Sequence, residues 1–329
     1  MPSLSPTFLL VAALVLLFSY LNGVTGSASL IAPVLSTRAL GPRQAVWLVT
    51  LVMCAAPFLL GVAVARSFGA GILRPDLVTV PVLLAATFSA SAWSVMAWRL
   101  QIPSSSSHAL IGGLLGAGLA DVGLSDVQWR GVLGVMAALF FSPVLGLLAG
   151  YVITKLLYRL GQAATPKIGG LVKKAQIVTA MALALSYGAN DGQKTIGLLA
   201  LALAVTSKQP ITIPNWISAV TMAAVALGTL TGGWGTITTL GGRFYKIQPI
   251  HGLGAQIAAA CVTFSAALVG GPVSSTQVIS TALLGAGAAD RINKVRWGVA
   301  TDILWTWLLT IPATALLAGG VFFIVRGWF

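Results

Sequence analysis

Two short runs of hydroxyl side chains are the first residues in this sequence that could do chemistry. The runs are Ser105, Ser106 and Ser107, and Ser274, Ser275 and Thr276. Each follows a proline, Pro103 or Pro272, and opens a short apolar segment, which predicts a helix start. There the hydroxyls and the first unpaired N–H groups point outward, and the helix end carries about half a positive charge. Two such ends facing each other would form a neutral, donor-rich cage for a tetrahedral oxyanion.

A second polar island lies at residues 186–197, inside an otherwise apolar stretch. Asp191 and Lys194 are three residues apart, so on a helix they share a face and could neutralise each other. A purely structural ion pair is one interpretation, but ionisable residues inside a membrane span are functional candidates by default. Asn190 belongs to the same island. We therefore expect Asp191 and Lys194 to line a functional site.

The elements that position these residues are repeated. The segment 102–121 aligns with 271–290 at one constant offset, which pairs Pro103 with Pro272 and Gly116 with Gly285. This predicts two homologous halves. We expect a first repeat at 1–160 with a hairpin tip near 103–108, a linker at 161–172, and a second repeat at 173–329 with a tip near 272–277.

The composition is that of a membrane protein: 57% hydrophobic residues, 8% charged residues and a mean hydropathy of +0.94. The apolar runs predict spans at 8–21, 45–65, 77–98, 131–157, 177–205, 216–230, 253–269 and 302–325. Basic residues exceed acidic ones, and Lys155, Arg159, Lys167, Lys173 and Lys174 cluster around the linker. The positive-inside rule places that linker in the cytoplasm. Charges set singly at span ends argue against a nucleic-acid partner.

Each segment that follows a hydroxyl run stays apolar for about thirteen residues before reaching Asp121 or Asp290, whereas a span needs about twenty. Each therefore favours a re-entrant helical hairpin, whose tip must be enclosed by protein or face water. Interrupted segments at matching positions in two halves are the usual sign of a transporter's binding site. We predict an all-α, multi-pass protein of the inner membrane with two inverted repeats.

With these motifs together, the sequence resembles the PiT family of inorganic phosphate transporters over essentially its whole length. The resemblance rests on segments 188–197, 103–108, 272–276, 36–40 and 295–298. It implies a cation-coupled phosphate symporter, a homodimer in membrane lipid, in which phosphate lies between the two tips near the Asn/Asp motifs. It implies substrate contacts from Ser105, Ser106, Ser107, Asn190, Asp191, Lys194, Ser274, Ser275 and Thr276. No enzyme activity, cofactor or metal other than a coupling sodium is expected.

The sequence departs from the family pattern at positions expected to bind the coupling ion. The family's first motif usually reads Asn-Gly-x-x-Asp-Ala-x-Asn, but here the acid is Gly26 and the second Asn is Ser29. Gln256 stands where members often have Glu. Coupling is thus assigned to Asn22, Asp191 and Gln256, with sodium bound weakly and a proton as the substitute ion.

Two alternatives remain open from the sequence. A sulfate or other oxyanion permease of the same fold would use the same hydroxyl and backbone donors. An uncoupled channel or a non-transporting membrane scaffold would fit the missing first-repeat acid. Sulfate competition and saturable uptake distinguish these from a phosphate symporter.

Overall fold

The computed structural model describes residues 5–71, 77–125, 127–163, 168–237 and 245–329, and within them it contains helices but no strand. Lys167 lies outside the described residues. The first repeat contains α1 (Pro6–Ser36), α2 (Pro42–Leu60), α3 (Ala63–Gly71), α4 (Val80–Arg99), α5 (Ser106–Val122) and α6 (Trp129–Leu160). The second contains α7 (Ile168–Tyr187), η2 (Gly188–Gly192), α8 (Gln193–Ser207), α9 (Asn215–Thr231), α11 (Pro249–Leu268), α12 (Ser275–Asp290), η3 (Ile292–Lys294) and α13 (Trp297–Val325).

Seven described helices are long and apolar enough to cross a membrane, with α7, η2 and α8 counted together as one. The expected span at 216–230 is the exception, because α9 has only 17 residues. Helix α7 begins at Ile168, within the segment expected as a linker. The exact domain boundaries stay a prediction.

Helix α1 continues well past the expected span 8–21, through the polar first-repeat motif to Ser36. Two of its polar side chains are paired within the helix: Thr25 Oγ1 donates to the Leu21 carbonyl at 2.9 Å and Ser29 Oγ to the Gly26 carbonyl at 2.7 Å. In the second repeat, part of the polar island forms one turn of π-helix, η2, between α7 and α8. Both motifs thus lie inside long helices.

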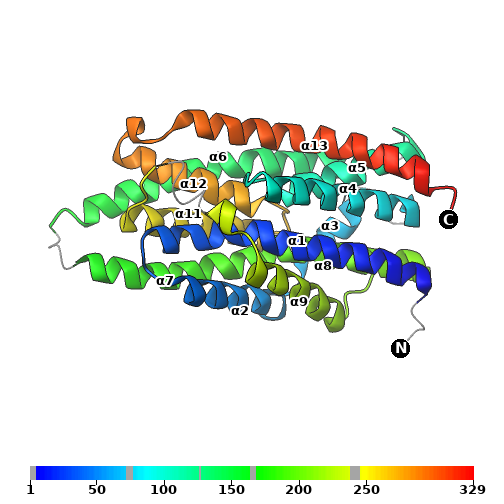
Figure 1. The fold of residues 1–329 in the computed structure, drawn as a ribbon, viewed down its shortest axis with the longest axis horizontal. Helices are drawn as coiled ribbons and strands as arrows, with labels where there is room; N and C mark the ends of the chain where they lie inside the picture. The colour runs from blue at the N-terminus through cyan, green and yellow to red at the C-terminus, as the bar shows by residue number, and fades with distance from the viewer. Residues whose placement is uncertain (1–4, 72–76, 126, 164–167, 238–244) are drawn as a thin grey trace.

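The two hairpins are α4–α5 and α11–α12. Helices α5 and α12 have 17 and 16 residues, short of the roughly 20 needed to cross a bilayer. They extend from the middle of the molecule toward opposite ends, as expected for inverted repeats (Figure 1). Each packs on the long helix of the other repeat: α5 on α13, and α12 on α6.

The packing of each short helix on the other repeat brings helix backbones close together, and the paired glycines Gly116 and Gly285 leave room for this. A Cβ atom added at Gly116 of α5 would lie 2.0 Å from the Ala315 carbonyl oxygen of α13. One added at Gly285 of α12 would lie 2.0 Å from the Leu147 carbonyl oxygen of α6. Small residues let helix backbones approach in this way in membranes. The matching glycine of each hairpin therefore lets that hairpin pack closely on the other repeat.

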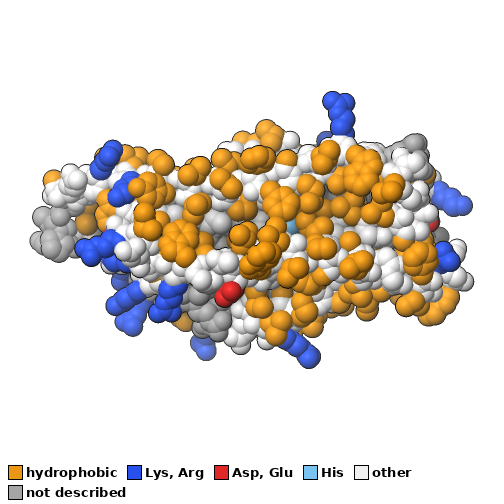
Figure 2. All heavy atoms as spheres, turned by 90° about the horizontal axis from the view of Figure 1, so that it is seen from above, with side chains coloured by type: hydrophobic (Ala, Val, Ile, Leu, Met, Phe, Trp, Pro, Cys, Tyr) orange, Lys and Arg blue, Asp and Glu red, His pale blue; other side chains and the backbone are white. Residues whose placement is uncertain are grey.

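The surface agrees with a membrane location. Figure 2 shows apolar side chains over the middle of one face, while most Lys and Arg side chains lie toward the ends. The last turn of α6 and the first turn of α7, on either side of their connection, lie at one end of the molecule, while the start of α1 and the end of α13 lie at the other end (Figure 1). Lys155, Arg159, Lys173 and Lys174 flank that connection. The basic residues are thus concentrated at the end opposite the termini.

Candidate functional site

The two hairpin tips meet in the protein interior. Ser105, at the N-cap of α5, donates its hydroxyl proton to the hydroxyl oxygen of Ser274, at the N-cap of α12, with 2.9 Å between the oxygens. Ser105 Oγ also accepts from the backbone N–H of His108 at 3.2 Å, so it caps its own helix. The expectation that the tips approach each other is confirmed. The short helices α5 and α12 therefore direct their positive ends toward a common region.

The first tip is held by two tryptophans. Trp93 of α4 donates its indole N–H to Ser104 Oγ at 2.7 Å, and Trp307 of α13 donates to the Pro103 carbonyl at 3.1 Å. The second tip is held by Asn190 of η2, whose Nδ2 donates to the Gly271 carbonyl at 2.9 Å. Its Oδ1 accepts from the Val273 N–H at 3.1 Å. Asn190 thus supports the tip backbone with both ends of its amide.

The second-repeat motif places an ion pair against both tips. Lys194 Nζ lies 2.8 Å from Asp191 Oδ1, and both side chains are at most 4% exposed. The ammonium also donates to Ser107 Oγ at 2.6 Å and to the Val273 carbonyl. Ser107 in turn donates to Asp191 Oδ1 at 3.0 Å, and the Ser275 N–H donates to Asp191 Oδ2 at 3.1 Å. A single carboxylate therefore links η2 to the starts of α5 and α12.

The first-repeat motif contributes amide and hydroxyl groups in place of charges. Asn22 Oδ1 accepts from Ser106 Oγ at 2.7 Å. The Tyr187 hydroxyl lies 3.3 Å from both Asn22 Oδ1 and the Asn22 carbonyl oxygen. A Cβ atom at Gly26 would lie 1.7 Å from this hydroxyl oxygen. The phenol of Tyr187 thus fills the space beside the position where the family usually carries the first-repeat acid.

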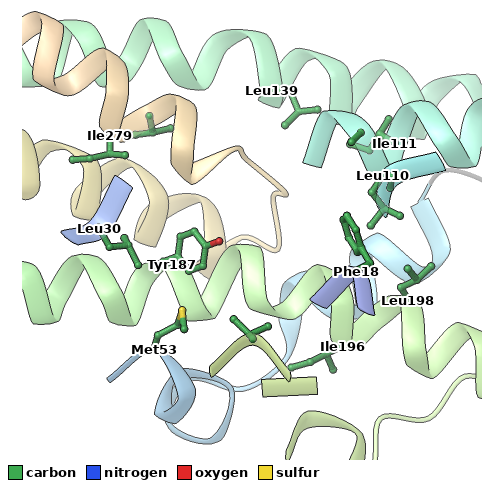
Figure 3. Close-up of a cluster of buried hydrophobic side chains, with 14 of the residues drawn as sticks. Phe18, Leu30, Met53, Leu110, Ile111, Leu139, Tyr187, Ile196, Leu198 and Ile279 are labelled. Atoms are coloured by element: carbon green, nitrogen blue, oxygen red, sulfur yellow. The ribbon is translucent and has the colours of Figure 1, made fainter. Parts of the chain in front are cut away.

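Tyr187 is fixed in this position by its surroundings. It is a buried residue at the end of α7, and Figure 3 shows its ring near Leu30 of α1 and Met53 of α2, with its hydroxyl directed away from α7. A well-packed aromatic ring has little room to move aside. A side chain at Gly26 would therefore overlap the Tyr187 hydroxyl.

Some polar groups at the tips have no partner among the described residues. Ser275 Oγ is buried without a hydrogen bond, as is Gln277 Oε1, while Gln277 Nε2 lies 3.3 Å from His108 Nδ1. Thr276 is also buried. Buried polar atoms are rarely left unpaired. Ser275 Oγ is therefore a tip hydroxyl whose hydrogen-bonding capacity is unused by the described residues.

Gln256 does not lie with the other expected coupling residues. Its Oε1 accepts from Thr179 Oγ1 at 2.8 Å. Thr179 precedes Asp191 by twelve residues along α7 and η2, which is about 18 Å at the helical rise. Asn22 reaches the tips through Ser106, and Asp191 reaches them directly. The three residues assigned to coupling therefore do not form one site.

Two contributors were not identified from the sequence as site residues. Tyr187 lies in the polar island at 186–197, and a tyrosine inside that island was a usable signal. The Val273 carbonyl is a backbone group, so residue type carries no information about it. Only the meeting of η2 with the second tip reveals that this carbonyl faces the ion pair.

The fold and the site together define a polytopic membrane transporter with inverted repeats. The family model described as "Phosphate transporter family" matches residues 22–169 and, a second time, residues 161–318. The chain therefore belongs to that family. The double match confirms the two repeats expected from the sequence.

Individual relatives and a solved structure agree with this assignment. The chain is 38% identical over 314 residues to a probable low-affinity inorganic phosphate transporter of Rhizobium meliloti, covering 94% of each chain. It is 35% identical over 325 residues to a protein of the same description from Bacillus subtilis, covering 97% of each. A solved structure titled "The sodium-dependent phosphate transporter" matches with a TM-score of 0.90 at 22% identity, covering 99% of this chain and 100% of that chain. This last similarity establishes the fold.

Proposed function

We propose that this protein is a secondary active transporter that carries inorganic phosphate across the cytoplasmic membrane, with the anion bound where the two hairpin tips meet. The observation that supports it best is the contact between Ser105 and Ser274, which brings two helix N-termini together. Such ends favour anions without the permanent grip of several arginines. Release to either side therefore stays feasible.

Within this site, the hydroxyls and backbone N–H groups of Ser105–Ser107 and Ser274–Thr276 serve as the anion's donors. Ser275 Oγ is assigned to the anion because that group has no partner among the described residues. Asn190 acts through the tip backbone that it supports. Lys194 directs its protons to three protein oxygens, so its contribution to the anion is its positive charge.

Phosphate is favoured over sulfate by the carboxylate of Asp191. A phosphate that carries a proton can donate it to an acceptor, whereas sulfate at neutral pH has no proton to donate. Asp191 lies at both tips and would repel an anion that cannot donate. Excess sulfate should therefore leave labelled phosphate uptake nearly unchanged, and strong competition would favour a general oxyanion permease.

We further propose that uptake is coupled to a cation, proton or sodium, through Asp191, and that Asn22 and Gln256 contribute separately. The basic residues around the α6–α7 connection place that end in the cytoplasm. The transporter is a homodimer in the lipid bilayer, as the family resemblance implies. Crosslinking in native membranes tests the dimer, and labelling of introduced cysteines tests the orientation.

Ser275→Ala tests the site. The hydroxyl bonds to no described protein group, so its loss should leave folding intact while weakening phosphate transport by about 1–3 kcal/mol, the cost of an unmet buried hydrogen bond. Labelled phosphate uptake into proteoliposomes, at matched protein content, measures the change. Ser280→Ala is the matched control on the same helix, because Ser280 Oγ bonds to the Thr276 carbonyl within α12. Unchanged uptake kinetics in Ser275→Ala would remove this residue from the anion site.

A further inference from the structure

The surroundings of Lys194 are those of a bound cation. Lys194 is 2% exposed, and its ammonium group directs its protons at three oxygens of three different kinds. These are the Ser107 hydroxyl, the Asp191 carboxylate and the Val273 carbonyl. Hydroxyl, carboxylate and carbonyl oxygens are the ligands that hard metal cations prefer. An ammonium has three donors and no acceptor, so these contacts use its whole hydrogen-bonding capacity.

The three oxygens come from separate parts of the chain. Ser107 belongs to the first tip, Val273 to the second tip, and Asp191 to η2. A cation at this point therefore joins both hairpins to the long helix of the second repeat. Without a positive charge there, the Asp191 carboxylate would be buried with one N–H and one hydroxyl as its partners, which is unfavourable for an ionised group.

The first repeat shows what the same position looks like without a lysine. Asp191 and Lys194 correspond to Gly26 and Ser29 in the first motif. Ser29 Oγ donates to the Gly26 carbonyl at 2.7 Å, so its hydroxyl bonds within α1. The Tyr187 hydroxyl occupies the space beside Gly26. The first-repeat position thus has no carboxylate and no added charge, while the second has both.

We propose that Lys194 is a tethered cation that permanently occupies a sodium-type site of the second repeat, so that this site does not take up sodium during transport. The positive charge that links the two tips is then part of the chain, and it remains when phosphate leaves. Removing the lysine side chain should leave an oxygen-lined site of one negative charge that accepts a free sodium ion. This inference refines the coupling proposed above. Only its consequence for transport rests on the proposed function.

The test replaces Lys194 by Ala, which opens the site, or by Asn, which adds an amide oxygen as the family's first motif does. Thermal stability of the purified protein in detergent is compared in sodium chloride and choline chloride at equal ionic strength. Ligand that binds the folded state raises the unfolding temperature. We expect a sodium-specific rise in Lys194→Ala or Lys194→Asn and none in the wild type. Lys174→Ala, an exposed lysine on α7, is the control for loss of a charge.

A double variant locates the ion. Asp191→Asn combined with Lys194→Ala should abolish the sodium-specific rise, because the carboxylate that would pair with the ion is gone. In proteoliposomes, sodium should stimulate phosphate uptake by Lys194→Ala about fivefold or more, a typical coupling between two ligands, while the wild type changes less than twofold. A sodium-specific rise in the wild type as large as in the variants would overturn the proposal. So would folded Lys194 variants that ignore sodium. Absence of phosphate uptake in the wild type would contradict the proposed function, while the stability comparison would still decide the role of Lys194.

Discussion

The two halves of the site share a backbone plan and differ in chemistry. In the first repeat, the motif lies in an uninterrupted α-helix, α1, and presents Asn22 to Ser106. In the second repeat, it lies in a π-helical turn and presents the Asp191–Lys194 pair to Ser107 and to the backbone of Ser275. The duplicated tips therefore face a neutral partner on one side and an ionised partner on the other.

This difference shows that the duplication fixes where groups lie, while each repeat's own residues decide their charge. The π-turn accommodates one extra residue per turn, a feature often found at functional sites. It lets Asn190 support the second tip while the neighbouring Asp191 reaches both. Helix α1 has no such turn, and Tyr187 occupies the space where a side chain at Gly26 would lie. The second repeat thus supplies the charged side chains that contact both hairpin tips.

The largest effect is expected from Asp191→Asn, which removes from the second repeat the carboxylate that the first repeat lacks. The amide keeps an acceptor for the Ser275 N–H but leaves the Lys194 ammonium buried without its counter-charge. Breaking a buried pair in this way costs about 3–5 kcal/mol. Gradient-driven phosphate accumulation should be lost, while phosphate exchange can persist. Unfolding in detergent measures the first effect, and accumulation and exchange in proteoliposomes measure the second.

A compensating variant separates charge from shape in the same experiment. Asp191→Asn with Lys194→Met removes both charges and keeps similar volumes, and such replacements are often neutral or stabilising. Stability should return in the double variant, but accumulation should not. Full gradient-driven accumulation in Asp191→Asn would show that the ion pair is structural only, and the two repeats would then be functionally equivalent.

The next effect is expected from Gly26→Ala, which tests whether Tyr187 is what keeps the first repeat neutral. The added Cβ would overlap the Tyr187 hydroxyl, and overpacking of this kind costs about 1–3 kcal/mol. In a Tyr187→Leu background the same substitution should cost less, with a coupling of at least about 0.5 kcal/mol. A double-mutant cycle of unfolding free energies measures it. Equal costs in both backgrounds would mean that the neighbouring helices, and not Tyr187, exclude a side chain here.

Much of this arrangement was predictable because the repeat and the local residue patterns can be recognised in the sequence without knowing which distant segments meet. The matched Pro103 and Pro272, and the hydroxyls after each, predicted both hairpin tips. The spacing of Asp191 and Lys194 predicted their contact, which is observed at 2.8 Å. The paired Gly116 and Gly285 indicated the repeat, although the sequence did not show that each packs on the other repeat.

The rest could not be predicted because it depends on which distant segments meet. Gln256 was grouped with Asn22 and Asp191 because it stands where the family often has Glu, yet its place on α11 puts it beside Thr179, far from the tips. The ligands of the Lys194 ammonium include the Val273 carbonyl, and every residue has a carbonyl. The role of Gly26 depends on the ring of Tyr187, which reaches α1 from another helix. Contacts of this kind appear only in the folded chain.

The smallest effect is expected where the repeats end, at Asp290 of α12 and its counterpart Asp121 of α5. Asp290 Oδ2 accepts from Lys294 Nζ at 2.5 Å, and this hydrogen bond holds the pKa of the Asp290 carboxyl below its usual value, although partial burial opposes the shift. Asp121 Oδ2 accepts instead from the Thr79 hydroxyl at 2.8 Å. Because the folded-state pKa of Asp290 is lowered, its pair stabilises the protein above the unfolded pKa of about 3.9. That contribution is lost as the pH falls through the folded pKa.

Asp290→Asn should therefore cost about 0.3–0.5 kcal/mol at pH 7, the usual value of an i,i+4 pair, and the cost should shrink as the pH is lowered below about 4. Asp121→Asn keeps an acceptor for Thr79 and serves as the control. Unfolding of both variants across pH in detergent decides it: equal, pH-independent losses would mean that the two repeat ends are equivalent, and that the charge asymmetry is confined to the tips.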